Sequence, residues 1–137
     1  MKLQGTQTHA NLKAAYAAES AASVMYRWSA QQADVEGFPE VAKRFTAISE
    51  AKVGQAMGHL QYLELLGDPA TGLVIGDALD NLEAARVGES NKASEMFPGF
   101  AETAREEGLT EIAEWFESAI RTDEGHADKF AASRDEL

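Results

Sequence analysis

Apolar residues recur along most of the chain at three- and four-residue spacings, the pattern of amphipathic α-helices. Alternating β-branched runs are scarce, whereas the helix-favouring residues alanine, glutamate, lysine and leucine are common. We interpret the apolar stripes as packing surfaces rather than as a cofactor-binding box. The two clearest stripes are Val41, Phe45, Ile48, Met57, Leu60 and Leu63, and Ile112, Trp115, Phe116, Ala119 and Ile120.

Glycine, proline and capping residues divide the chain into four predicted helices. Glycine ends the first and third helices, because it readily adopts the left-handed conformation found after a helix. Proline is tolerated in the first turn of the second helix and is expected to kink the third. The predicted helices are 6–36 before Gly37, 39–66 from Pro39, a third from the region of Asp77 to Asn81 up to Gly108 with Pro98 inside it, and 110–132.

Short turns at the two glycines would join these helices into two antiparallel hairpins. The hairpins repeat each other over residues 11–66 and 81–132. The longer connection from Gly67 to Gly76 is typical of a crossover between hairpins. We therefore predict one all-α domain over residues 1–137, a ferritin-like antiparallel four-helix bundle. Because a duplicated hairpin can pack on either copy, two chains could also exchange hairpins.

Composition narrows the classes of function. The 137-residue chain is 45% hydrophobic, which suits one domain with a core, and it has no cysteine. Disulfides, iron–sulfur clusters and thiolate zinc sites are therefore excluded. A net charge of −11 argues against nucleic acid or an anionic membrane as a partner. No secretion signal or membrane-spanning segment is evident, so we expect a cytoplasmic location.

The two repeats differ at the positions where metal-binding or catalytic residues would be expected. Each has a pair of polar residues spaced by three, and such residues share one helix face. The pair is Lys52 and Gln55 in the first repeat and Asp123 and His126 in the second. An acid three residues before a histidine is able to bind a metal ion, whereas a lysine and a glutamine are poor ligands.

The other helix of each repeat carries a glutamate at a matching depth. Glu19 in the first repeat corresponds to Glu89 in the second, and Lys92 follows Glu89 by three residues. If the hairpins pack symmetrically, all of these side chains point toward the bundle axis. Buried charges are costly unless they are paired or bind a metal ion. The cluster is therefore expected to be a metal site or an ion-pair network.

Several segments resemble those of the rubrerythrin family: residues 11–20 (NLKAAYAAES), 33–39 (ADVEGFP), 95–101 (EMFPGFA), 104–108 (AREEG) and 111–116 (EIAEWF). The resemblance covers about residues 5–130. It implies a ferritin-like bundle with a non-haem di-iron centre, which the family uses to reduce hydrogen peroxide. Many members also carry a rubredoxin domain with four cysteines. Because this sequence has no cysteine, we expect the short, erythrin-only type.

The resemblance places some of the family's metal ligands on this chain unchanged. Glu19 and Glu89 fall on glutamate ligands, and His126 falls on a histidine ligand. Asp123 falls where the family has a bridging glutamate, so a carboxylate remains on a shorter side chain. These four are the expected metal-binding residues if any metal ion binds.

Three other ligand positions have changed in kind. Lys52 replaces the second bridging glutamate, Gln55 replaces a histidine, and Lys92 replaces a further glutamate. Two lysines can pair with the remaining carboxylates and so take over the charge-balancing role of two metal ions. We therefore expect no bound cofactor, with a single iron or manganese ion at the retained positions as the open alternative.

These expectations leave several functions open, and no catalytic residue is assigned. The leading one is a non-catalytic binding or regulatory module that acts on an unidentified protein partner through its surface. The main alternative is an oxidoreductase that reduces peroxide or oxygen at a mononuclear iron or manganese site. Metal storage or sensing lies between these two, and a lysine acting as base or nucleophile is a further reading. We expect a homodimer, with exchange of hairpins as one form of it.

Overall fold

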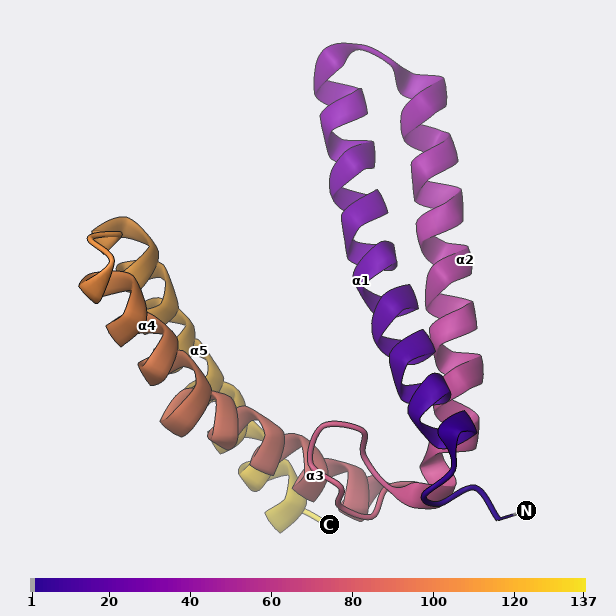
Figure 1. Cartoon of the computed structure of the whole chain (residues 1–137), viewed down its shortest axis with the longest axis vertical. Helices are drawn as coiled ribbons and strands as arrows, with labels where there is room; N and C mark the ends of the chain where they lie inside the picture. The colour runs from indigo at the N-terminus through magenta and orange to yellow at the C-terminus, as the bar shows by residue number, and fades with distance from the viewer. Residues whose placement is uncertain (1) are drawn as a thin grey trace. The chain divides into compact units, whose positions relative to one another are not determined.

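The computed structural model describes residues 2–137, and all regular elements in that range are helical. The chain divides into two compact units, the first extending to Pro69 and the second comprising Ala70–Leu137. Each unit contains one helical hairpin, as the sequence predicts (Figure 1). None of the helices in this range combines the length and apolar character needed to cross a membrane. The first unit contains α1 (Gln7–Glu36), α2 (Pro39–Leu63) and the 3₁₀ turn η1 (Glu64–Leu66); the second contains α3 (Ala78–Asn91), the π-helical segment η2 (Lys92–Met96), α4 (Phe97–Glu106) and α5 (Thr110–Asp135).

Local signals set the ends of the helices in the first hairpin. The Thr6 hydroxyl caps α1 by accepting a hydrogen bond from the backbone N–H of His9 at 3.0 Å. Gly37 ends α1 in the left-handed conformation with a φ of 86°. Pro39 then begins α2, where its missing N–H leaves no helical hydrogen bond unmade. These helix starts and the end of α1 match the sequence prediction to within one residue, while η1 replaces the last predicted turn of α2.

Small side chains let α1 and α2 approach each other. The Ser49 hydroxyl donates a hydrogen bond of 2.6 Å to the carbonyl oxygen of Ser23, which ties the two helices together. The rings of Tyr26 and Phe45 also meet across the hairpin, with centroids 5.9 Å apart. Leu63, only 1% exposed, is the largest fully buried side chain. Besides Leu63, the buried residues in these two helices are Ala30, Ala33, Ala42, Ser49 and Ala56.

The second hairpin follows the same plan. The Asp77 side chain caps α3 by accepting a hydrogen bond of 2.8 Å from the backbone N–H of Asp80. Gly108 makes the turn before α5 in the left-handed conformation, with a φ of 78°. The last helix extends three residues beyond its predicted end at residue 132, to Asp135.

The third predicted helix is not continuous, and this corrects the sequence prediction. The π-helical segment η2 separates α3 from α4, and the backbone N–H of Phe97 donates to the carbonyl oxygen of Lys92, five residues earlier. Pro98 follows immediately, and its ring and missing N–H disfavour a regular α-helical turn just before it. The expected disturbance near Pro98 therefore takes the form of a widened turn.

Residue spacing in the two repeats accounts for this segment. Glu89 follows Glu19 by 70 positions, whereas Gly108 follows Gly37 by 71. The second repeat therefore has one additional residue between its glutamate and its turn, in the interval that contains η2. Because a π-bulge accommodates one more residue in a helix, the insertion and the bulge are the same feature.

Aromatic rings and alanines pack the second hairpin. Phe97, Phe100 and Phe116 form a cluster in which the closest ring centroids, those of Phe100 and Phe116, are 5.5 Å apart. Trp115 from the predicted apolar stripe is nevertheless 71% exposed. Within a hairpin, each helix has one neighbouring helix, which covers only one of its sides. Residues to either side of that contact therefore stay accessible. The buried residues of this hairpin are Ala84, Ala93, Ala101, Ala104 and Ala113, and exposed members of both predicted stripes include Val41, Ile48, Met57 and Ile112.

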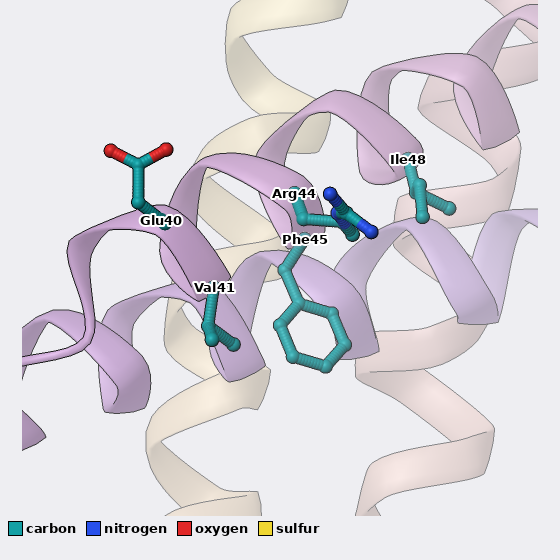
Figure 2. Close-up of a pocket in the computed structure, with 5 residues that line it drawn as sticks. All are labelled: Glu40, Val41, Arg44, Phe45 and Ile48. Atoms are coloured by element: carbon teal, nitrogen blue, oxygen red, sulfur yellow. The ribbon is translucent and has the colours of Figure 1, made fainter.

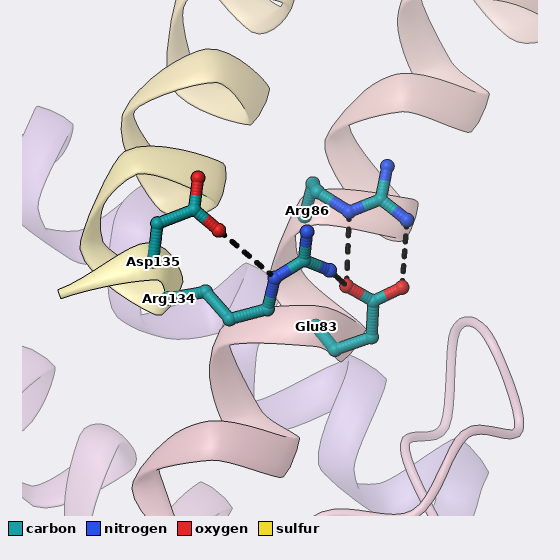
Figure 3. A network of polar contacts seen from close by, with 4 residues as sticks. All are labelled: Glu83, Arg86, Arg134 and Asp135. Atoms are coloured by element: carbon teal, nitrogen blue, oxygen red, sulfur yellow. Dashed lines mark hydrogen bonds and ion pairs between the residues drawn. The ribbon is translucent and has the colours of Figure 1, made fainter. Parts of the chain in front are cut away.

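Ion pairs connect the start of α3 to the end of α5 (Figure 3). The Glu83 carboxylate accepts hydrogen bonds of 2.9 and 2.6 Å from the guanidinium group of Arg86, and a further one from Arg134. Arg134 also lies 4.0 Å from the carboxylate of Asp135. Chiefly through the hydrogen bonds from Arg86, the pKa of Glu83 is lowered from 4.5 to about 2.

Glu83→Gln is expected to lower the thermal unfolding midpoint modestly at pH 7 and hardly at all near pH 2. A carboxyl group with a depressed pKa stabilises the fold fully above its unfolded value of about 4.5, and this contribution is lost as the pH falls through about 2. The effect stays small because the group is on the surface. Circular dichroism melts across this pH range, with the exposed Glu114→Gln as the control, provide the check. An equal difference at both pH values would contradict the assignment.

Candidate functional site

The first hairpin holds one lysine–glutamate pair at the predicted site. Glu19 in the first half of α1 and Lys52 in α2 lie at the same level, and Lys52 Nζ is 3.4 Å from both carboxylate oxygens of Glu19. The side chains are partly buried, 26% exposed for Lys52 and 19% for Glu19. Gln55 lies one turn further along α2 and is exposed. The negative charge of the Glu19 carboxylate is thus balanced by the ammonium group of Lys52.

The second hairpin gathers four of the predicted residues. Lys92, the first residue of η2, places its Nζ 3.1 Å from Oε2 of Glu89 at the end of α3. On α5, Nδ1 of His126 lies 3.6 Å from Oε1 of Glu89 and 3.7 Å from a carboxylate oxygen of Asp123. The imidazole therefore lies between two carboxylates, and the ammonium group of Lys92 approaches the opposite oxygen of Glu89.

One oxygen in this group lacks a hydrogen bond. Oε2 of Glu89 is buried and, within the described residues, accepts no hydrogen bond. The ammonium group of Lys92 lies 3.1 Å from this oxygen and forms an ion pair with it. Ligand atoms of Glu89, Asp123 and His126 all lie within 4.8 Å of one another. Three oxygen and nitrogen donors at that spacing are able to surround one divalent cation. The unbonded Oε2 of Glu89 lies beside Lys92, whereas Oε1 is the oxygen that lies 3.6 Å from His126.

The structure thus assembles the predicted residues into two sets. Glu19 and Lys52 form a contact in the first unit, and Glu89, Lys92, Asp123 and His126 form contacts in the second. The pairing of lysines with glutamates agrees with the charge argument from the sequence. The meeting of the two sets in one site stays a prediction.

Sequence reasoning did not anticipate an apolar hollow of about 320 Å³ on α2 (Figure 2). Val41, Phe45 and Ile48 contribute its apolar surface, and the only polar lining residues are Glu40 and Arg44. In Figure 2 the side chains of Val41 and Phe45 point to the same side of the helix, while Glu40 is directed away from them. A hollow with so few converging polar groups offers little to orient a substrate. The three- and four-residue spacing of its apolar residues was the available signal.

Comparison with known proteins identifies the family. The sequence model of the Rubrerythrin family matches residues 10–133, which is nearly the whole chain and includes Glu19, Lys52, Glu89, Lys92, Asp123 and His126. This chain belongs to the rubrerythrin family. The sequence resemblance is therefore confirmed at the level of the family, while the state of the metal-ligand positions stays a prediction.

Individual relatives span most of this chain. Rubrerythrin of Porphyromonas gingivalis is 33% identical over 134 residues, which cover 95% of this chain and 67% of that protein. Rubrerythrin of Nitratidesulfovibrio vulgaris is 34% identical, over 93% of this chain and 69% of the relative. The chain thus spans about two thirds of the length of these relatives. A solved structure of nigerythrin in its fully reduced, all-ferrous state is 27% identical, with a TM-score of 0.45, over 92% of this chain and 65% of that chain.

Proposed function

We propose that this member of the rubrerythrin family is a non-catalytic binding or regulatory module in which lysine–carboxylate ion pairs replace the di-iron centre. The supporting observation is that each glutamate at a predicted ligand position is already paired with a lysine of its own hairpin. Lys52 lies 3.4 Å from Glu19, and Lys92 lies 3.1 Å from Glu89. A metal ion would have to displace both cations to reach these carboxylates.

Charge and donor count both disfavour two metal ions. The positive charges of Lys52 and Lys92 cancel the negative charges of Glu19 and Glu89, so only Asp123 remains unmatched by a lysine. Two multivalent cations need several carboxylates to balance their charge, and each ammonium group would repel them. Among the described residues, the only cluster with three candidate ligands is that of Glu89, Asp123 and His126. This donor set does not suit a di-iron centre.

Iron content is expected to distinguish this protein from its catalytic relatives. After anaerobic reconstitution with ferrous ion and desalting, we expect less than about 0.2 equivalents of iron, because paired lysines compete for the ligand carboxylates. Elemental analysis gives this number, and nigerythrin, whose solved structure is described as all-ferrous, is the positive control. About two equivalents in this protein would refute the proposal.

The second candidate is a mononuclear metal site in the second hairpin. Ligand atoms of Glu89, Asp123 and His126 within 4.8 Å of one another favour it. These three residues would hold a single iron or manganese ion, which would supply redox chemistry toward peroxide or oxygen. In that case reconstitution gives about one equivalent. His126→Ala would abolish the binding, whereas His59→Ala, a histidine outside this cluster, would not.

A further inference from the structure

The second hairpin brings three metal-ligating side chains together by itself. Ligand atoms of Glu89, Asp123 and His126 lie within 4.8 Å of one another, and all three residues belong to the unit Ala70–Leu137. Two carboxylates and an imidazole form a donor set that suits a single divalent ion such as zinc. The contacts that define this set are those between α3 and α5 and within α5, so it is complete without the first hairpin.

A cation already lies against this donor set. Nζ of Lys92 is 3.1 Å from Oε2 of Glu89, while Nδ1 of His126 is 3.6 Å from Oε1 of the same carboxylate. A metal ion on Oε1 and an ammonium group on Oε2 would share one carboxylate and lie only a few ångströms apart, a distance at which like charges repel. The ammonium group of Lys92 and a divalent ion therefore compete for Glu89.

The charge of the cluster depends on Lys92. Glu89 and Asp123 carry two negative charges and a metal-bound imidazole is neutral, so the three ligands alone balance one divalent ion. The ammonium group of Lys92 cancels one of these negative charges and leaves too few to do so. The Lys92 side chain is 42% exposed, so replacing it by another residue removes the charge without opening a cavity in the core.

The first hairpin has a similar ion pair but no comparable donor set. Lys52 Nζ lies 3.4 Å from both carboxylate oxygens of Glu19. Among the described residues, however, no group of three candidate ligands includes Glu19. A single carboxylate offers one ligand, whereas zinc takes about four and other divalent ions take more. Loss of Lys52 would therefore free one carboxylate without creating a metal site.

We propose that the Lys92 ammonium group is an internal competitor of divalent ions at a one-metal site in the second hairpin. It occupies the Glu89 carboxylate and keeps divalent ions out, and loss of this one positive charge is sufficient to open the site. The ligands are Glu89, Asp123 and His126, with none from the first hairpin. This inference rests on the proposed function, in which lysines take the place of metal ions, and it gives Lys92 a role that Lys52 does not share.

The test is zinc binding by the full chain, measured by isothermal titration calorimetry. Lys92→Met removes the charge and keeps an unbranched side chain. We expect it to bind about one zinc ion per chain, with a dissociation constant lower than that of the unsubstituted protein by about tenfold or more. The matched control is Lys129→Met, the same substitution at an exposed lysine of the same hairpin. Neither Lys129→Met nor Lys52→Met should change the zinc affinity.

Further variants separate the site from effects on folding. Lys92→Gln is a second neutral replacement that suits a helix, and circular dichroism should show unchanged helix content for both Lys92 variants. Combining Lys92→Met with His126→Ala should abolish the gained binding, because the ion then lacks one of its three ligands. Zinc should also raise the thermal unfolding midpoint of Lys92→Met more than that of the unsubstituted protein, since binding to the folded state stabilises it.

The outcomes are distinct. Tighter zinc binding by both Lys92 variants, but not by Lys52→Met or Lys129→Met, supports the proposal. No gain in the folded Lys92 variants overturns it, and so does an unsubstituted protein that already binds one zinc ion as tightly. An equal gain for Lys52→Met contradicts a site confined to the second hairpin. None of these results is the one that refutes the proposed function, which is about two iron ions in the unsubstituted protein.

Discussion

The combined variant Lys52→Glu, Gln55→His and Lys92→Glu is expected to bind about two iron ions, whereas we expect the unsubstituted protein to bind almost none. The three changes restore the side chains that the family resemblance assigns to these positions. They remove both ammonium groups, which pair with Glu19 and Glu89 at 3.4 and 3.1 Å. Elemental analysis after anaerobic reconstitution gives the stoichiometry. A new absorption band of the loaded variant provides an independent readout.

The matched control changes the same amount of charge away from the site. Lys43→Glu combined with Lys129→Glu alters one exposed lysine in each hairpin, and neither position is a predicted ligand. This double variant should bind no more iron than the unsubstituted protein. If it binds equally well, general negative charge attracts the metal. If the triple variant keeps its helix content but gains no iron, the two sets of residues do not form a common metal site.

Local signals made the hairpins predictable from the sequence. A capping threonine, a capping aspartate and two turn glycines act within a few residues of the helix ends that they define. Gly37 ends α1 and Asp77 precedes α3, as the pattern indicates, whereas the cap at Thr6 was not predicted. Helical periodicity did not indicate the interior face in the same way, because the buried residues are mostly alanines and several large members of the predicted stripes are exposed. The resemblance to rubrerythrins, carried by motifs spread over both repeats, correctly gave the family.

The π-helical segment was not predicted, because periodicity within one helix does not reveal a single inserted residue. The spacing of apolar residues remains helix-like when one residue is inserted. Pro98 indicated an irregular helix nearby but not that the irregularity is a π-helical segment. A comparison of the repeats contains the missing information, in the change of offset from 70 at Glu89 to 71 at Gly108. Internal duplication thus supplies a reference helix against which an insertion can be counted.

For the candidate site, the sequence indicates which residues share a helix face, but it does not give the contacts between helices. Spacing by three correctly placed Asp123 with His126 and Glu89 with Lys92. It gave no means to decide which carboxylate each lysine contacts, because that choice depends on side-chain reach and on the η2 backbone. The unbonded Oε2 of Glu89 likewise follows from three-dimensional placement. Convergence of both hairpins on one centre depends on tertiary packing and stays a prediction.

Leu63→Ala is expected to lower the free energy of unfolding by about 2–5 kcal/mol, the largest stability effect of the substitutions considered. Leu63 is 1% exposed at the end of α2, while the other buried apolar side chains of that helix are alanines. Truncation of this fully buried side chain therefore leaves a cavity. Urea denaturation followed by circular dichroism measures the change. The control is Leu65→Ala, the same substitution two residues later at a side chain that is 67% exposed, which should change the free energy little. Equal losses for the two variants would mean that burial at Leu63 does not carry the stability of this hairpin.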